Sequence, residues 1–224
     1  MTPANIAGMA YVKGLDVIAV TDHNSIKNCE ATAKAGEAFG LTVLFGMELT
    51  TQEEVHVVCL FPSIEKAAKW DEYVYDRLMK IQNDPDIFGH QYVMNSEDGI
   101  LHEEKNLLIN AADIDFERVF PLVDEYGGVA FPAHIDKSSN SLISNLGFVP
   151  PDSQFGCVEI KDMDKYKKLC SDYPYLSGCR VLKNSDAHRL EDISEPVNFL
   201  HSESKSPDDI IFALKKKTTD SKSF

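Results

Sequence analysis

Short apolar runs that end in a histidine or a carboxylate recur along the chain. The first is the β-branched run Val17–Val20, which is followed at once by Thr21, Asp22 and His23. A run of this length and composition predicts a strand buried on both faces. Because α/β folds place chemistry at the carboxyl-terminal tips of such strands, this tip is a candidate site. Taken alone, the segment also fits a strand followed by an ordinary polar turn.

Four further apolar runs follow the same pattern, three ending in a chemically active side chain and one beginning with it. They span residues 41–48, 55–60, 128–134 and 180–188, and their active side chains are Glu48, His56, His134, Asp186 and His188. We expect the strand ends and the one strand start to bring these groups, together with His23, to one rim of the fold. Mixed imidazole and carboxylate ligands suit Zn²⁺, Mn²⁺ or Fe²⁺, so the pattern predicts a metal cluster.

Helical signals fill the segments between these runs. The first helix is expected to begin at Pro3, with Thr2 as its N-cap and Gly14 just past its end. Its expected apolar face contains Ile6, Met9 and Ala10. Further helices are expected over residues 25–39, after Ser63 with an apolar face of Trp70, Val74, Leu78 and Ile81, over residues 115–126, and from Ser206 to Lys217. Strands that alternate with helices predict the α/β class.

Two segments depart from this alternation. Residues 82–112 are irregular, and an Asp98-Gly99 turn between short apolar arms predicts a hairpin insertion near 88–104. His90 and His102 fall in this segment and are expected at the surface. The Ser-, Asn- and Pro-rich segment 136–156 predicts a long loop with a short helix at Leu142–Leu146, and loops of this length are commonly functional. We expect residues 1–224 to form one domain.

The composition is that of a globular protein. The chain has 224 residues, of which 43% are hydrophobic and 26% charged, and it is long enough for a closed core. It contains neither a signal peptide nor an apolar run of the roughly 18 residues that span a bilayer. We therefore expect no membrane partner. The five cysteines lack Cys-x-x-Cys spacing, which favours a reduced, cytoplasmic protein.

The charge balance bears on the class of partner. A formal net charge of −14 argues against broad neutralisation of nucleic-acid phosphates, so a long nucleic acid is an unfavourable partner. Part of the acidity can belong to metal sites, and bound ions would reverse the local charge there. We therefore expect a small anionic substrate.

Together these motifs resemble the PHP (polymerase and histidinol phosphatase) superfamily of metal-dependent phosphoesterases. The resemblance covers about residues 2–202 and rests on the segment from Gly14 to His23, the Gly46-x-Glu48 motif, the Ala-His at His134 and the Ser-Asp-Ala-His that ends at His188. It implies a distorted TIM-like (β/α)7 barrel. Members begin with a strand that bears His-x-His, whereas no histidine precedes Thr21 here. The expectation is a truncated chain that lacks its first strand, in preference to a degenerate member.

The resemblance also implies the roles of the candidate ligands, with up to three ions in a complete site. Glu48, His56 and His134 would share one ion, and Glu48 and Asp186 would bridge toward the ion of the missing motif. A third ion would lie between His23 and His188. Asp22 would orient a neighbouring ligand or cap the turn after the strand. Because the ion of His56 and His134 keeps all its protein ligands, we expect one tightly bound metal and weak binding of the others. Hydrolysis is expected to be slow or absent unless the missing strand is restored.

Lys137 and Arg189 are candidate phosphate contacts because each lies within a few residues of a candidate ligand. Their alternative role is that of ordinary surface cations. The function implied by the resemblance is hydrolysis of a small phosphomonoester, such as a nucleotide, a nucleoside bisphosphate or an oligonucleotide end, by a metal-activated hydroxide. Two alternatives stay open: a non-catalytic PHP-like module that binds metal or a partner protein, and an amidohydrolase that cleaves C–N bonds.

Overall fold

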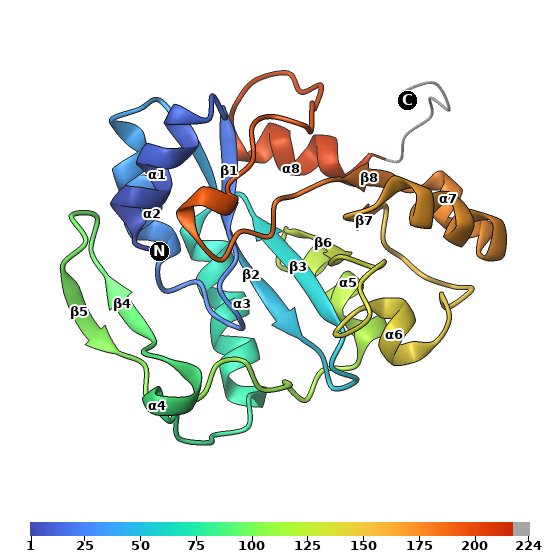
Figure 1. The fold of residues 1–224 in the computed structure, drawn as a ribbon, viewed down its shortest axis with the longest axis horizontal. Coiled ribbons are helices and arrows are strands. Elements are labelled where there is room, and N and C mark those ends of the chain that lie inside the picture. The colour runs from blue at the N-terminus through green and yellow to red at the C-terminus, as the bar shows by residue number, and fades with distance from the viewer. Residues whose placement is uncertain (217–224) are drawn as a thin grey trace.

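A four-stranded mixed sheet forms the centre of the fold in the computed structural model, which describes residues 1–216 (Figure 1). The strand order is β1-β2-β3-β6. The four strands are β1 (Val17–Val20), β2 (Thr42–Thr50), β3 (His56–Phe61) and β6 (Val129–Pro132). β1 and β2 are parallel, whereas β3 is antiparallel to both of its neighbours. The start of β3 therefore lies at the same edge as the ends of β2 and β6.

Two smaller sheets accompany the central one. β7 (Cys157–Glu159) and β8 (Arg180–Leu182) form a parallel pair next to β6, where the Ile135 N–H donates to the Glu159 carbonyl at 2.9 Å. β4 (Tyr92–Met94) and β5 (Ile100–Glu103) form an antiparallel hairpin. The hairpin projects to one side of the central sheet (Figure 1).

The mixed α/β class is confirmed, but the strands of residues 1–216 do not close into a barrel. Between β6 and β7 the backbone hydrogen bond runs from Ile135, past the end of β6, to Glu159, the last residue of β7, and no continuous ladder of hydrogen bonds joins the two sheets of the described chain. The expected (β/α)7 barrel is therefore not observed. The ends of β1, β2 and β6 and the start of β3 nevertheless lie at one edge of the central sheet.

Helices cover both faces of the central sheet. The longer helices are α1 (Pro3–Val12), α2 (Cys29–Glu37), α3 (Ile64–Arg77), α5 (Phe116–Glu125), α7 (Met163–Asp172) and α8 (Pro207–Lys215). The short ones are α4 (Pro85–Phe88), α6 (Leu142–Leu146) and the 3₁₀ turns η1 (Pro174–Gly178) and η2 (Leu190–Asp192). None of the helices in residues 1–216 has the length and apolarity that crossing a membrane requires.

The run of apolar residues in β3 is explained by burial on both faces. Val57, Cys59 and Phe61 pack into the main core with α3 and α5, whereas Val58 and Leu60 pack against α8. Successive side chains of a strand point to opposite faces, so a strand covered on both sides needs an unbroken apolar run.

Three helix predictions need correction. α3 ends at Arg77 because Leu78 turns to an extended conformation and pairs with Ala112, which leaves Ile81 45% exposed and off the expected face. α2 begins at Cys29, since residues 24–28 form a turn whose Ile26 N–H donates to Asp71.

In α1 the buried residues are Pro3, Ala7 and Ala10, because small side chains let α1 pack closely on α2. The Thr2 hydroxyl does not cap this helix but donates to Asp98 of the hairpin at 2.6 Å. Ser206 caps α8 as expected, and the predicted helix residue Lys217 lies outside the described residues.

Candidate metal centre

The tip of β1 lies beside the end of β2. Parallel pairing continues past β1 through a bridge between His23 and Glu48, and the Glu48 N–H donates to the Asp22 carbonyl at 3.1 Å. The Asn24 N–H in turn donates to the Glu48 carbonyl at 3.0 Å. This register sets the side chains of His23 and Glu48 next to each other.

β3 and β6 supply two more histidines to the same edge. Because β3 is antiparallel to β2, His56 at its start pairs with Thr50, two residues past Glu48. His134 follows the end of β6, where the Ala133 N–H donates to the His56 carbonyl at 3.0 Å. His134 has a φ of 30°, and a non-glycine residue with positive φ is uncommon and often marks a functional site.

The three imidazoles surround the Glu48 carboxylate. His56 Nδ1 and His134 Nε2 each lie 3.2 Å from Glu48 Oε1, and His23 Nδ1 lies 3.5 Å from Glu48 Oε2. One ligand atom each from His23, Glu48 and His56 falls within 4.8 Å of the others. The structure therefore brings together four of the six metal ligands expected from the sequence.

The chemistry of this group fits a divalent ion. Glu48 is only 7% exposed, and within residues 1–216 it forms ion pairs with three histidines. The Nδ1 atoms of His23, His56 and His134 are buried and make no hydrogen bond within the described chain. Buried polar groups are normally partnered, so the Nδ1 atoms of His23 and His56 beside the carboxylate are well suited to a metal ligand set, and His134 faces the same carboxylate through Nε2.

Burial and neighbouring charge prepare these groups for metal binding. Burial acts to raise the pKa of Glu48, but the nearby imidazoles of His134 and His56 outweigh it and hold the pKa below its usual range. Burial lowers the pKa of His23, more than the Glu48 charge raises it. Metal ligands must be ionised carboxylates and neutral imidazoles, and both shifts favour these forms near neutral pH.

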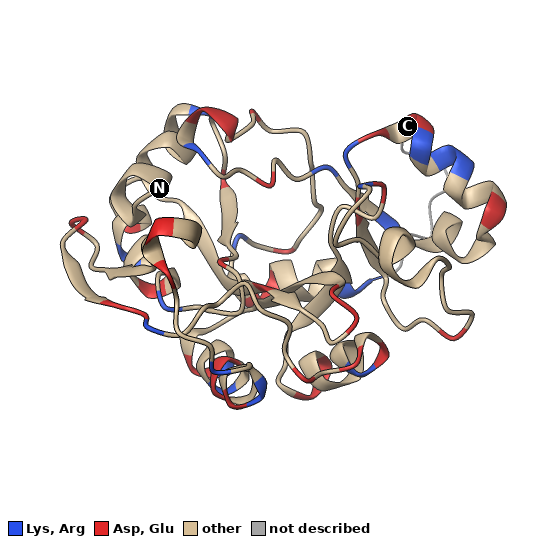
Figure 2. Ribbon diagram, turned by 60° about the horizontal axis from the view of Figure 1, so that its bottom comes forward, with Lys and Arg blue, Asp and Glu red and all other residues tan. Residues whose placement is uncertain are grey.

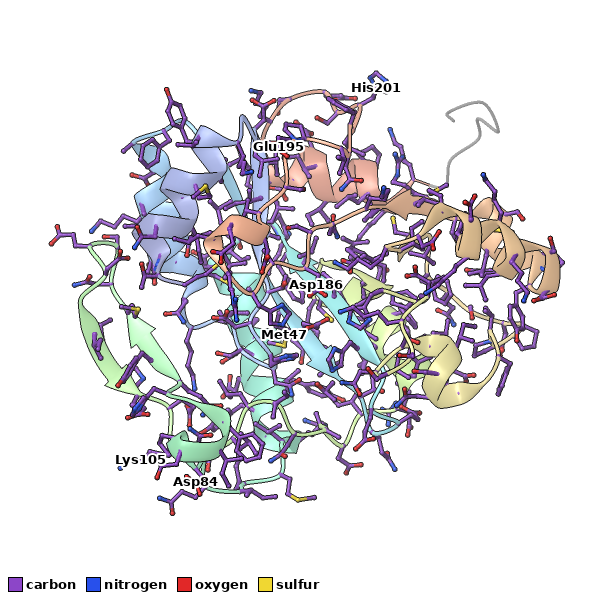
Figure 3. The ribbon with its side chains drawn as sticks, in the orientation of Figure 1. Met47, Asp84, Lys105, Asp186, Glu195 and His201 are labelled. Carbon is purple, nitrogen blue, oxygen red and sulfur yellow. The ribbon has the colours of Figure 1, made fainter. Side chains whose placement is uncertain are left out.

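Asp186 lies in a different environment from Glu48. The segment after β8 carries Asp186 to the middle of the view in Figure 3, and its Oδ2 accepts from Lys137 Nζ at 2.6 Å. Lys161 Nζ is 3.5 Å from the same oxygen. Lys137, which we expected to contact phosphate, thus pairs with the carboxylate that was expected to bridge two ions.

His188 and Arg189 are both exposed on the segment after Asp186. His188 Nδ1 lies 3.0 Å from the Asp186 carbonyl oxygen, and its charge contributes to lowering the pKa of His23. The backbone N–H of Arg189 donates to Asp192 at 3.2 Å and begins η2. These two residues lie beside the group of four without joining it.

Three residues near the site were not predicted. Lys161 neutralises Asp186, and Glu159 at the end of β7 accepts from the Asn184 amide at 2.8 Å. Burial raises the pKa of Glu159, against the lowering effects of the Asn184 amide and of His134. Glu159 follows the pattern of an apolar run ending in a carboxylate, which was the available signal. Asn24, directly after His23, is fully buried by contacts that only the structure reveals.

No family model matches the chain. A curated relative, an uncharacterized protein of Methanocaldococcus jannaschii, is 37% identical over 73 residues, which are 32% of this chain and 43% of the relative. The lesion-specific endonuclease EndoQ of Pyrococcus furiosus has a TM-score of 0.62 at 18% identity, covering 96% of this chain and 51% of EndoQ. The chain thus spans about half the length of EndoQ and matches less than half of the curated relative.

Two further solved structures match over most of their own length. A protein of Bifidobacterium adolescentis that is assigned to the metal-dependent phosphoesterases has a TM-score of 0.57 at 16% identity, covering 95% of this chain and 90% of that protein. An amidohydrolase of Chromobacterium violaceum, solved with bound sulfate, has a TM-score of 0.56 at 17% identity, covering 87% of this chain and 85% of the amidohydrolase. Proteins with this architecture therefore include several kinds of hydrolase.

EndoQ has also been solved with a 27-mer duplex that carries an abasic lesion at the active site, with a TM-score of 0.52 and 18% identity to this chain. A protein with this fold therefore binds DNA, which weighs against our expectation that a long nucleic acid is an unfavourable partner. The charges are also unevenly distributed, since Lys165, Lys167 and Lys168 gather on α7 (Figure 2). These matches show that the chain shares its fold with EndoQ and with a protein assigned to the metal-dependent phosphoesterases.

Proposed function

We propose that this chain is a metal-dependent phosphoesterase whose metal centre is formed by Glu48, His23, His56 and His134. The observation that carries the proposal is the buried Glu48 carboxylate, which lies 3.2–3.5 Å from a ring nitrogen of each of three imidazoles. The occurrence of this fold in a protein assigned to the metal-dependent phosphoesterases supports the reaction class.

A divalent ion bound here would polarise a phosphoryl oxygen and supply a nucleophilic water near neutral pH. The chain's own contribution is to hold the ligands in place. The register of β2 and β3 fixes Glu48 beside His56. The imidazoles of His134 and His56 keep the Glu48 carboxylate ionised against the effect of burial, and burial keeps His23 neutral. In this proposal Asp186 is a further ligand that Lys137 and Lys161 neutralise when it is not on a metal.

Lys137 and Arg189 would contact the substrate phosphate. The Lys137 side chain is 39% exposed and that of Asp186 is 14% exposed, so the ammonium group lies on the solvent side of their ion pair. An incoming phosphate can then accept from Lys137 while the pair loosens. Arg189 is exposed and can offer a planar, bidentate donor to phosphate oxygens.

A small phosphomonoester, such as a nucleotide or nucleoside bisphosphate, is the proposed substrate. The second candidate is a phosphodiester of damaged DNA, which is favoured by the match of EndoQ to nearly the whole chain. The two candidates share the metal centre and differ in the length of the polymer that must pass over it.

Phosphate release in Mn²⁺ tests the proposal. The wild-type chain would be given a panel of phosphomonoesters and, in parallel, a duplex with an abasic lesion. Glu48→Gln and His134→Ala should each abolish release, whereas His90→Ala, on the exposed hairpin, should leave it unchanged. Duplex cleavage without monoester turnover would establish the second candidate, and loss of both in the wild type would overturn the enzymatic proposal.

A further inference from the structure

A cavity of about 190 Å³ opens directly beside the metal centre. Its lining includes Thr50 at the end of β2, Glu54 in the turn before β3, and His56 itself. Asn110, before α5, and Asn140, after β6, complete its polar wall. Drug-sized ligand pockets measure roughly 300–1,000 Å³, so this cavity has room for one ring of a substrate and not for a whole nucleotide.

Two polar side chains of the cavity have no partner within residues 1–216. Thr50 is 3% exposed and its hydroxyl makes no hydrogen bond, and the Asn110 Nδ2 is also buried and unpaired. Thr50 lies two positions after Glu48 in a strand, so both side chains project from the same face of the sheet. Unsatisfied buried donors next to a metal centre indicate groups that await a ligand.

Asn24, which directly follows the candidate ligand His23, ties the walls of the cavity to the metal centre. The Asn24 Oδ1 accepts from the Thr50 N–H at 2.9 Å, and its Nδ2 donates to the carbonyls of Leu108 and Asn110, each at 2.7 Å. On the opposite wall, the His56 N–H donates to the Asn140 carbonyl at 3.0 Å. The cavity is therefore held in a constant position relative to His23 and His56.

The chemistry of the lining selects the class of group that fits. The residues that line the cavity include no lysine or arginine, and Glu54 places a carboxylate at its wall. A second phosphate would meet this negative charge without a compensating cation. The lining offers amide donors, a hydroxyl and a carboxylate acceptor, and sugar hydroxyls both donate and accept hydrogen bonds.

We propose that this cavity binds the hydroxyl-bearing sugar ring of a sugar phosphate or nucleotide while its phosphate lies on the metal centre. This inference rests on the proposed phosphoesterase function. The Thr50 hydroxyl and the Asn110 amide are specificity-determining groups, since each would hydrogen-bond to a ring hydroxyl that a plain alkyl phosphate lacks.

The first test compares ribose 5-phosphate with propyl phosphate as substrates of the Mn²⁺-loaded chain. The wild type should show a higher kcat/KM for the sugar phosphate. Thr50→Val and Asn110→Leu should each lower the ratio of the two kcat/KM values by about three- to tenfold, the range expected for one hydrogen bond. Thr42→Val, the same substitution at the opposite end of β2, is the matched control and should leave the ratio unchanged.

A binding measurement separates this inference from the proposed reaction. The phosphonate analogues of the two esters, which are not hydrolysed, would be titrated into the Zn²⁺-loaded chain while the Asn110 side-chain amide is followed by NMR. The sugar phosphonate alone should shift that signal, with weaker affinity in Thr50→Val. A shift of the Asn110 signal without any turnover of the esters would support the sugar pocket and refute the phosphoesterase. Turnover with the same ratio of kcat/KM values in the wild type and all variants, or equal shifts of the Asn110 signal from both phosphonates, would refute the pocket.

Discussion

Replacing Glu48 by Gln should remove most of the stabilisation that a divalent ion gives to this protein. The Glu48 carboxylate lies 3.2–3.5 Å from three imidazole nitrogens and is the shared acceptor of the group. Glutamine keeps the size and shape of the side chain but loses the charge that a metal ligand set requires. Because neighbouring imidazoles hold the pKa of this buried carboxylate below its usual range, its loss should also lower the stability of the metal-free form, so the quantity to compare is the metal-dependent rise in Tm.

The size of the effect follows from binding linkage. An ion present at 100 times its Kd stabilises the folded state by about 2.7 kcal/mol. For a chain of this length, about 1 kcal/mol corresponds to roughly 2–4 °C in Tm, so the wild type should gain about 5–11 °C. If removal of a metal-coordinating group weakens affinity about 100-fold, the upper end known for supporting residues, the gain falls to about 0.4 kcal/mol, or about 1–2 °C.

Thermal unfolding of the wild type and Glu48→Gln, with and without Zn²⁺ or Mn²⁺ at equal concentrations, would measure this difference. Glu125→Gln removes an exposed carboxylate from the last turn of α5 and should behave as the wild type does. An equal metal-dependent rise in Tm for the wild type and Glu48→Gln would refute the assignment of the metal to this group.

Three further predictions concern the support of the site. Gly46→Ala should lower Tm and metal affinity, since the added methyl would lie 2.6 Å from the Cys59 carbonyl oxygen. Overpacking of this kind costs about 1–3 kcal/mol. As the control, Gly8→Ala in α1 places its methyl where no atom lies within 4 Å and should be neutral or stabilising. Lys137→Ala should weaken competitive inhibition by inorganic phosphate, with Lys167→Ala on α7 as a control of equal charge change; unchanged inhibition would remove Lys137 from the phosphate site. The unfolding free energy of the metal-free chain should fall as pH drops through about 6.5 and again through about 4.5, because the lowered pKa values of His23 and Glu48 mean that the unfolded chain binds more protons there. A pH titration of chemical unfolding, with His23→Asn lacking the first decline, checks the last of these.

Local sequence signals determined the elements that carry the site. The short helix at Leu142–Leu146 was predicted with the bounds that the structure shows, because Ser141 caps its start and Gly147, with positive φ, ends it. The strand ends at His23 and Glu48 were equally clear, since an abrupt change from apolar to polar residues is a local property. Such features need no knowledge of the rest of the fold.

Long-range contacts were not accessible in the same way. The pairing of Lys137 and Lys161 with Asp186 joins three separate segments, and no local pattern distinguishes these lysines from surface cations. The early end of α3 depends on a bridge from Leu78 to Ala112, which overrides the helical spacing of Ile81. Barrel closure is likewise a property of how β6 and β7 meet, and the spacing of strands along the chain does not contain it.

Anomalous diffraction from crystals of this chain soaked in Mn²⁺ would test the central claim most directly. We predict a strong anomalous peak in contact with the Glu48 carboxylate and the imidazoles of His56 and His134, and its absence in Glu48→Gln crystals. A peak bound elsewhere, or one that persists in Glu48→Gln at the same occupancy, would contradict the account of this group as the metal centre.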